Sequence, residues 1–307
     1  MIAELQQKIK ALKEENKVTI LAHSYVSEAI QEIADHTADS FRLAELAQLS
    51  KNKTIIMCGV RFMAETCKVL CPQKKIILAN PQSGCPMAEQ FSVDEIKQIK
   101  KLLPDYTTVC YINTTAEVKT LCDVCVTSSS AVEICKKIDN DKILFLPDAN
   151  LGAFVQSKVP NKTFKFLQGG CPIHANVTVK DAEEAKRLHP NALLLVHPEC
   201  RPDVVALADY TGSTTGIMDF AKNYNAKEFI IGTELAIVEH LQYAYPEKKF
   251  YHLSKNLICP NMKITTLTDV YNALIGDGGE DIELPTQVKL RALKCINKMF
   301  ELNDSKT

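Results

Sequence analysis

A threefold repeat of cysteine-containing segments constrains the fold more than any other feature of the sequence. Cys85, Cys171 and Cys259 are each followed by proline and lie 86 and 88 residues apart. Seven residues after each cysteine stands a serine or threonine, and an acid follows three residues later. These pairs are Ser92 and Glu95, Thr178 and Asp181, and Thr266 and Asp269. A hydroxyl and an acid at this spacing are typical of a capped helix N-terminus. The sequence therefore predicts three copies of one unit, each supplying one thiol from an equivalent loop.

The segments between these markers alternate between helix-like and strand-like patterns. Amphipathic helices are expected near residues 2–15, 93–103 and 179–189, and further helices at 62–70, 234–244, 268–274 and 285–302. Short apolar strands are expected at 18–22, 54–58, 75–79, 108–112, 142–146, 192–196, 228–231 and 249–253, with a less regular one around 164–167. Apolar strands that alternate with helices indicate an α/β fold, with short parallel sheets covered on both faces.

The charge and composition exclude several classes of partner. The net charge is -1, and no long run of lysine or arginine indicates binding to nucleic acid or to an anionic membrane. The N-terminal segment reads as a charged amphipathic helix and not as a signal peptide, and no apolar stretch reaches the roughly 18 residues of a membrane span. Twelve cysteines without a secretory signal favour a reducing, cytoplasmic location and a metal or catalytic use for some thiols.

Polar residues that follow the predicted strands recur at the same spacing. His23, Tyr111 and His197 are 88 and 86 residues apart, and so are the hydroxyl residues Ser40, Ser128 and Thr214. Ligands of parallel α/β units bind beyond the carboxyl ends of the strands, where hydroxyls and backbone N–H groups suit carboxylates or phosphates. Each hydroxyl taken alone is better explained by a helix N-cap, and the recurrence beside His and Tyr favours a site for the set.

Two more residues near these loops are candidates for an active site. His174 lies three residues after Cys171, and Glu199 lies two residues after His197. We expect His23, His174 and His197 to line a site, and Glu199 to act as its general acid or base, because carboxylates near metal centres often have shifted pKa values.

Three thiolates are one short of the four that usually bind a cubane iron–sulfur cluster. A [4Fe–4S] cluster on Cys85, Cys171 and Cys259 would leave one iron without a protein ligand, which is typical of a catalytic centre. A structural zinc bound by three cysteines and His174 is the alternative. The single Cys122–Cys125 pair is a weak metal or redox signal, and Cys200 is a candidate because it lies in a site loop.

Several short motifs, spread over nearly the whole chain, together resemble the quinolinate synthase family. They are LAHSYV (21–26), Asp39-Ser40, RFMAE (61–65), CYIN (110–113), CVTSSSA (125–131), PDANLG (147–152), GGCPIH (169–174), HPEC (197–200), ADYTGST (208–214), GTE (232–234) and CPNMK (259–263). Two departures are visible: Ser130 stands where the family usually has asparagine, and Phe166 stands near a usual tryptophan.

The resemblance implies a fold and a reaction. It implies three pseudo-threefold-related, three-layer αβα domains around a central cavity. We expect these at residues 1–88, 89–175 and 176–262, with the helices of 263–307 packing back on the first. It implies condensation of iminoaspartate with dihydroxyacetone phosphate to quinolinate, with loss of phosphate and water, on a [4Fe–4S] cluster held by the three cysteines. The unstable imine suggests functional coupling to an aspartate-oxidising enzyme.

The resemblance also implies roles for individual residues. Tyr25, Glu199, His23 and His197 are expected to be catalytic. The expected substrate contacts are His23, Ser40, Tyr111, Ile112, Asn113, Ser128, His174, His197, Pro198, Glu199, Ser213, Thr214 and Lys263. Two alternatives remain: another three-cysteine [4Fe–4S] enzyme of similar build, and a non-catalytic metal-binding scaffold.

Overall fold

The computed structural model of the 307-residue chain describes residues 2–304. The chain divides into two compact units. Unit 1 comprises Met1–Glu89, Ile112–Thr120 and Cys259–Cys295, and unit 2 comprises Gln90–Tyr111, Leu121–Ile258 and Ile296–Thr307. Helix α16 (Thr286–Asp304) has residues in both.

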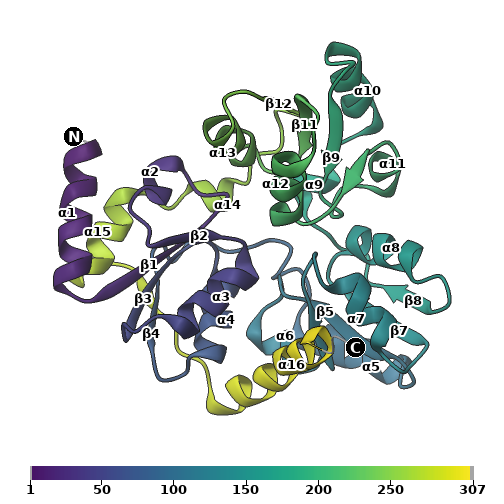
Figure 1. Ribbon diagram of the computed structural model, residues 1–307. Helices are drawn as coiled ribbons and strands as arrows, with labels where there is room; N and C mark the ends of the chain where they lie inside the picture. Colours follow the sequence, from purple (N-terminus) through teal and green to yellow (C-terminus); the bar gives the residue numbers. More distant parts are fainter. Residues whose placement is uncertain (1, 305–307) are drawn as a thin grey trace. The chain divides into compact units, whose positions relative to one another are not determined.

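Unit 1 is built on one sheet with the strand order β13-β4-β3-β1-β2. Strands β1 (Val18–His23), β2 (His36–Ala38), β3 (Thr54–Cys58) and β4 (Lys75–Leu78) are parallel, and β13 (Glu280–Asp281) pairs with β4 antiparallel. Its helices are α1 (Ile2–Glu15), α2 (Glu28–Gln31), α3 (Ser40–Leu49), α4 (Arg61–Leu70), α6 (Ala116–Lys119), α14 (Pro260–Lys263) and α15 (Leu267–Ile275). Helices α1 and α15 pack together on one face of the sheet, and α3 and α4 pack together on the other (Figure 1).

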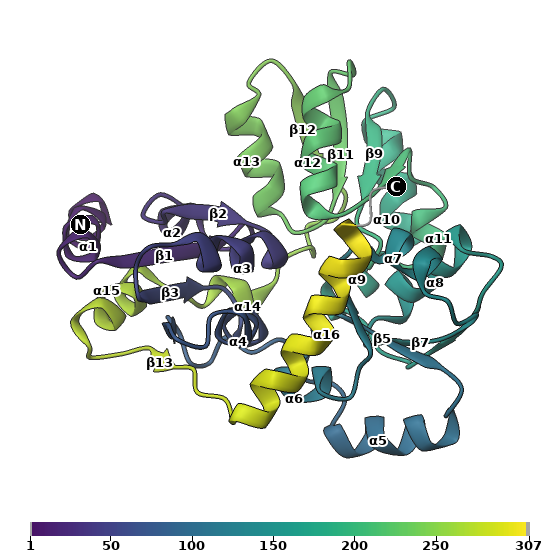
Figure 2. The same cartoon turned by 60° about the horizontal axis from the view of Figure 1, so that its bottom comes forward.

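Unit 2 contains two parallel sheets with the orders β6-β5-β7-β8 and β10-β9-β11-β12. The first consists of β5 (Thr107–Tyr111), β6 (Val124–Val126), β7 (Lys142–Leu146) and β8 (Thr163–Phe166). The second consists of β9 (Leu193–Val196), β10 (Tyr210–Thr211), β11 (Glu228–Gly232) and β12 (Lys249–His252). The helices are α5 (Val93–Leu102), α7 (Ala131–Lys137), α8 (Ala149–Lys158), α9 (Pro172–Ala175), α10 (Val179–Leu188), α11 (Pro202–Val205), α12 (Thr214–Asn223) and α13 (Ala236–Ala244), and the view in Figure 2 shows them flanking the two sheets.

The three sheets have the same design, which confirms the predicted α/β fold with short parallel strands. In each sheet the first strand of the copy lies between a very short strand and the second strand. Middle strands such as β1 and β9 are almost wholly buried, as parallel strands covered on both faces should be. The division into the domains 1–88, 89–175 and 176–262 stays a prediction. None of the described helices combines the length and apolar character that a membrane crossing requires.

The predicted capping boxes are all present. In α5, α10 and α15 the N-cap hydroxyl accepts a backbone N–H from the acid three residues on, and that acid accepts the N–H of the cap residue. Helix α15, which follows Cys259, packs on α1 and on β3 of unit 1. The capped helix that follows the third cysteine therefore packs on the sheet of the first copy.

Two further repeated contacts stabilise each copy. Asp35, Asp123 and Asp209 each accept the N–H of a residue in the first strand through a carboxylate oxygen and donate their own N–H to that residue's carbonyl. The buried ammonium groups of Lys74, Lys162 and Lys248 each donate to backbone carbonyls at or just beyond the C-terminal end of α3, α7 or α12. Buried lysines of this kind satisfy the unpaired carbonyls at helix ends and complement the helix dipole.

A third repeated contact fixes the cysteine loops. The N–H groups of Arg61, Ala149 and Leu235 donate to the carbonyls of Ser83, Gly169 and Leu257, at 2.8, 2.8 and 2.9 Å. Each of these carbonyls lies two residues before one of the three repeated cysteines. Every copy therefore ties its cysteine loop to the residue three positions after the end of its second strand.

Candidate active site and metal ligands

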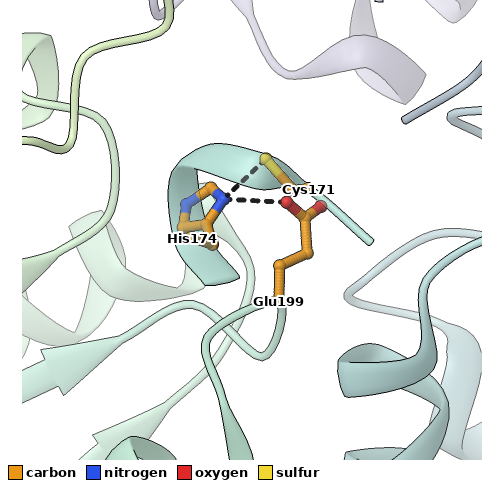
Figure 3. Close-up of side chains that lie close together, drawn as sticks. All are labelled: Cys171, His174 and Glu199. Atoms are coloured by element: carbon orange, nitrogen blue, oxygen red, sulfur yellow. Dashed lines mark hydrogen bonds and ion pairs between the residues drawn. The ribbon is translucent and has the colours of Figure 1, made fainter. Parts of the chain in front are cut away.

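The carboxylate of Glu199 is the centre of a buried polar group in unit 2. Glu199 follows β9, and only 4% of its surface is exposed. Its Oε2 lies 2.9 Å from Nδ1 of His174, which also lies 3.3 Å from the sulfur of Cys171 (Figure 3). The hydroxyl of Tyr111 donates a further hydrogen bond to this carboxylate. Four predicted site residues, Cys171, His174, Tyr111 and Glu199, are thus brought together.

The surroundings of Glu199 keep its side chain ionised. Burial alone raises the pKa of this carboxyl, but the nearby His197 and His174 imidazoles and the hydrogen bonds from His174 and Tyr111 outweigh it and lower the pKa to about 2. At neutral pH the site therefore holds a buried negative charge that is matched by hydrogen-bond donors.

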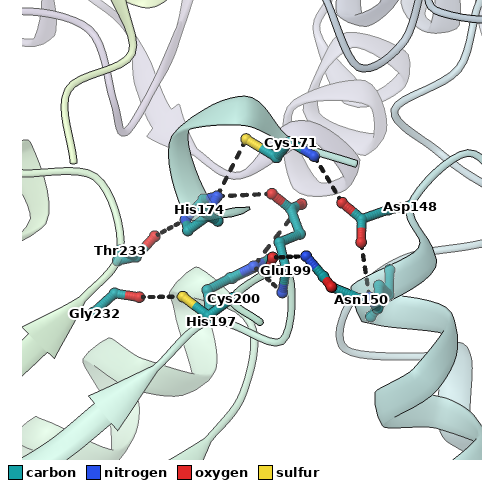
Figure 4. Close-up of polar contacts among 10 residues, drawn as sticks. Asp148, Asn150, Cys171, His174, His197, Glu199, Cys200, Gly232 and Thr233 are labelled. Atoms are coloured by element: carbon teal, nitrogen blue, oxygen red, sulfur yellow. Dashed lines mark hydrogen bonds and ion pairs between the residues drawn. The ribbon is translucent and has the colours of Figure 1, made fainter. Parts of the chain in front are cut away.

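The two histidines beside Glu199 are oriented by fixed partners. Nδ1 of His197 accepts the backbone N–H of Glu199 at 3.3 Å, so in the neutral ring the proton lies on Nε2. Nε2 of His174 lies 3.0 Å from the hydroxyl of Thr233, which follows β11. The His174 and His197 rings lie 5.0 Å apart between centroids (Figure 4). Thr233 was not predicted as a site residue, although it lies in the quoted GTE motif.

Asp148 is a second buried carboxylate, and it was not predicted as a site residue although it lies in the quoted PDANLG motif. One oxygen accepts the N–H of Leu151 at 2.8 Å and caps α8, and the other accepts the N–H of Cys171 at 2.9 Å (Figure 4). Burial and then the charge of Glu199 raise the pKa of Asp148 to about 7, against the effect of these two hydrogen bonds. The first turn of α8 contains Asn150, whose Nδ2 donates to the carbonyl of Glu199 at 3.0 Å.

Gln90 secures the same cysteine loop from another direction. Its Oε1 accepts the N–H of Gly170 at 3.1 Å, and its Nε2 donates to the carbonyl of Pro147 at 3.2 Å. A Cβ atom on Gly169 would lie 2.3 Å from Gln90 Oε1, so this glycine permits the close approach. Gln90 and Asp148 thus accept the two consecutive backbone N–H groups of Gly170 and Cys171.

In unit 1, His23 and Tyr25 repeat the local geometry of His197 and Glu199. Nδ1 of His23 accepts the N–H of Tyr25 at 3.2 Å, and the two rings meet edge to face, with 4.6 Å between centroids. The same Nε2–H tautomer therefore follows for the neutral His23 ring. Equivalent sequence positions thus produce equivalent backbone turns.

The repeated hydroxyls are not the N-caps of the helices they begin. Ser40 and Thr214 are the first residues of α3 and α12, whose N-caps are Asp39 and Ser213. Ser128 precedes α7, whose N-cap position is Ser130. The N-cap explanation therefore applies to Ser213 and to none of the three repeated hydroxyls. The other predicted contacts lie as follows: Ile112 and Asn113 after β5, Pro198 between His197 and Glu199, and Lys263 at the end of α14.

The two departures from the family pattern have structural roles. Ser130 Oγ accepts the N–H of Thr127 at 3.0 Å. The ring of Phe166 packs against Gly152 of α8, where an added Cβ would lie 2.6 Å from it.

Exposure separates the three repeated cysteines from the others. All twelve cysteines lie among the described residues; Cys85, Cys171 and Cys259 are partly exposed, and the other nine are buried. Cys171 and Cys259 occupy the N-cap positions of α9 and α14, and Glu89 accepts the N–H of Cys85 at 2.9 Å. Accessible thiols in equivalent, tethered loops have the donor chemistry that an iron–sulfur cluster needs.

The remaining candidate cysteines behave as core residues. Cys200 is fully buried, its thiol donates to the carbonyl of Gly232 at 3.6 Å, and burial raises its pKa. Cys110 and Cys125 are register partners in β5 and β6, and Cys122 forms a hydrogen bond with Cys110. Buried thiols that are held in the protonated state are poor metal ligands.

Comparison with known proteins assigns the chain to a family. The family model described as "Quinolinate synthetase A protein" matches residues 7–301. A "Quinolinate synthase" of Caldicellulosiruptor bescii is 47% identical over 301 residues, which cover 98% of this chain and 99% of the relative. "Quinolinate synthase 2" of Methanosarcina acetivorans is 42% identical over 299 residues, which cover 97% of this chain and 96% of the relative. The chain therefore belongs to the quinolinate synthetase A family.

Proposed function

We propose that the protein is a quinolinate synthase that uses a [4Fe–4S] cluster bound by Cys85, Cys171 and Cys259. It would condense iminoaspartate with dihydroxyacetone phosphate and release quinolinate, one phosphate and two molecules of water, which balances all atoms. The observation that carries the proposal is the buried, ionised Glu199 next to the Cys171 thiol, within a chain of this family.

The donor set supports the cluster. Three accessible thiols from equivalent loops leave one iron of a cubane without a protein ligand. When bound, such a cluster supplies a Lewis acid for a substrate oxygen that must leave as water. Asp148, through the N–H of Cys171, and Glu89, through the N–H of Cys85, would hold two of the ligand loops.

Glu199 is suited to move protons. Its carboxylate accepts hydrogen bonds from Nδ1 of His174 and from the hydroxyl of Tyr111. A substrate C–H or O–H group that takes the place of one donor removes a hydrogen bond that holds the pKa of Glu199 low, and it can then pass its proton to this oxygen. In unit 1, Tyr25 is proposed as the second proton-transfer group, with His23 fixing its backbone.

The anionic substrates would be bound by neutral donors and one ammonium group. Dihydroxyacetone phosphate and iminoaspartate carry phosphate and carboxylate groups, and the proposed contacts are the hydroxyls of Ser40, Ser128, Ser213 and Thr214, the amide of Asn113, the imidazoles and Lys263. Ser40 and Thr214 are the first residues of α3 and α12, and hydroxyls at helix N-termini suit anionic groups. An aspartate-oxidising enzyme is the proposed source of the imine.

A substitution at Glu199 tests the proposed chemistry. Anaerobically reconstituted wild-type protein should form quinolinate from both substrates, detected by mass. Glu199→Gln should lower kcat by about 100-fold or more, the scale of general acid–base catalysis, and should keep its iron. Glu228→Gln is the matched control, because Glu228 begins β11 whereas Thr233 follows the other end of that strand. Wild-type turnover in Glu199→Gln would refute the assigned role.

The same variant separates the cluster from the alternative metal site. Cys171, His174 and Glu199 offer ligand atoms within 4.8 Å of one another and could bind a single ion. A single ion bound there would be lost from Glu199→Gln, whereas a cluster on three thiols would remain. Iron and zinc content before and after the substitution therefore distinguishes the two sites.

A further inference from the structure

We infer that Gln31 and Lys119 are positioning residues that hold Tyr25 and Asn113, two residues of the proposed active site. The inference rests on the proposed function. Tyr25, Asn113 and Glu199 occupy equivalent positions of the repeat, 88 and 86 residues apart. Gln31 and Lys119 are also 88 residues apart, and each ends the short helix that follows its site residue, α2 or α6.

Gln31 bridges the two carbonyl groups that flank Tyr25. Its Nε2 donates to the carbonyl of Ser24 at 3.2 Å and to the carbonyl of Val26 at 3.0 Å. The first carbonyl belongs to the peptide that precedes Tyr25, and the second belongs to the peptide between Val26 and Ser27. A single nitrogen thus holds the chain on both sides of the Tyr25–Val26 pair, and Gln31 thereby restricts the direction of the Tyr25 Cα–Cβ bond.

Lys119 makes the same bridge around Asn113. Its Nζ donates to the carbonyl of Ile112 at 2.8 Å and also to the carbonyl of Thr114. Lys119 is 1% exposed, so its ammonium group has left water to make these two bonds.

The charge of Lys119 is compensated within unit 1. Glu65 is close enough to interact electrostatically with it, and the same carboxylate accepts the N–H of Ala116, in the first turn of α6, at 2.7 Å. The ring of Phe62 lies 5.9 Å from Nζ. Helix α4 thereby stabilises the buried ammonium group and the helix that carries it.

The third copy shows that the fold does not require this bridge. The equivalent residue there is Val205, which ends α11 and has no donor. The bridged carbonyls correspond to those of Pro198 and Cys200 in this copy, and the carbonyl between them, that of Glu199, is bound by Asn150. A different side chain thus holds the third site loop. Because the fold forms there without the bridge, we attribute the role of Gln31 and Lys119 to positioning Tyr25 and Asn113.

The expected effect is a loss of alignment. Displacing a positioned group by about 1 Å can cost about 100-fold in rate. Lys119→Met removes the bridge and keeps an unbranched side chain that is one atom shorter. We expect it to raise KM by about 10-fold or more, because Asn113 is a proposed substrate contact. Gln31→Leu should instead lower kcat by about 10-fold or more with KM within about threefold of wild type, because Tyr25 is a proposed proton-transfer group.

Two further variants exclude a merely structural effect. Lys119→Gln places the donor of the first copy in the second, and we expect it to recover kcat/KM to within about fivefold of wild type. Lys162→Met is the matched control, because Lys162 is also buried and binds two carbonyls, but at the end of α7. It should lower the midpoint of urea unfolding without changing KM. A wild-type KM in Lys119→Met, or an equal rise in Lys162→Met, would overturn the inference.

Amide hydrogen exchange tests the bridge without turnover. Lys119→Met should speed exchange in the peptide covering residues 112–116, and Lys162→Met should leave that peptide unchanged. Unchanged exchange in Lys119→Met would refute the bridge. Absence of quinolinate from wild-type protein would refute the proposed function, and the exchange result would still decide the bridge.

Discussion

Alkylation of the iron-free, reduced protein should separate its twelve cysteines into two groups. Burial raises the pKa of Cys58 and of Cys135 to about 12. At pH 8 such a thiol is ionised in about one molecule in 10,000, whereas an ordinary thiol with a pKa of about 8.5 is ionised in about a quarter. Since the thiolate is the reactive form, ionisation alone makes the two buried thiols about 2,000-fold slower than an ordinary one. Burial of their sulfur atoms slows them further.

The assay is mass spectrometry with light iodoacetamide under native conditions, followed by heavy iodoacetamide after unfolding. Cys85, Cys171 and Cys259 are partly exposed and should carry the light label first, and reconstitution with iron and sulfide should protect all three together. In urea all twelve should react. Native labelling of Cys58 or Cys135 as fast as Cys171, or protection of fewer than three, would refute the reasoning.

Three other predictions follow from local contacts. Replacing Cys85, Cys171 or Cys259 singly by alanine should lose most of the iron, whereas Cys122→Ser should retain it; iron analysis of purified proteins compares them. Thr178→Ala removes the capping box of α10 and should cost about 1 kcal/mol of unfolding free energy in urea, and an unchanged free energy would contradict the cap. A hydrogen bond from Arg61 lowers the pKa of Glu280 below its ordinary 4.5, so its stabilising contribution is present above that pH and is lost as the pH falls further. Glu280→Gln should therefore show a smaller loss of stability than wild type between pH 5 and pH 3, measured by urea unfolding.

Much of the fold was predictable because its signals are local. The hydroxyl and acid of each capping box stand three residues apart, and all three boxes form as expected. Strands β2, β6 and β10 were missed because two or three residues are too few for a hydrophobic period. The aspartates that tie the loops before these strands to the first strands recur at the repeat spacing, so Asp35, Asp123 and Asp209 could have indicated them.

The site was predictable only where residues lie close in the sequence or repeat. His174 beside Cys171 and Glu199 after His197 were selected for those reasons, and the structure brings Cys171, His174 and Glu199 together. Asp148 was not selected, because an aspartate at this position is explained by helix capping. Its second contact, to the N–H of Cys171, joins residues 23 positions apart and depends on how β8 returns the chain.

Anaerobic turnover with dihydroxyacetone phosphate labelled with carbon-13 at all three carbons tests the central claim most directly. The iron-loaded protein, supplied with this substrate and with iminoaspartate generated in place, should form quinolinate three mass units heavier than the unlabelled compound. Formation should require iron and both substrates. A protein that carries about four irons per chain and forms no labelled quinolinate would contradict the proposed reaction.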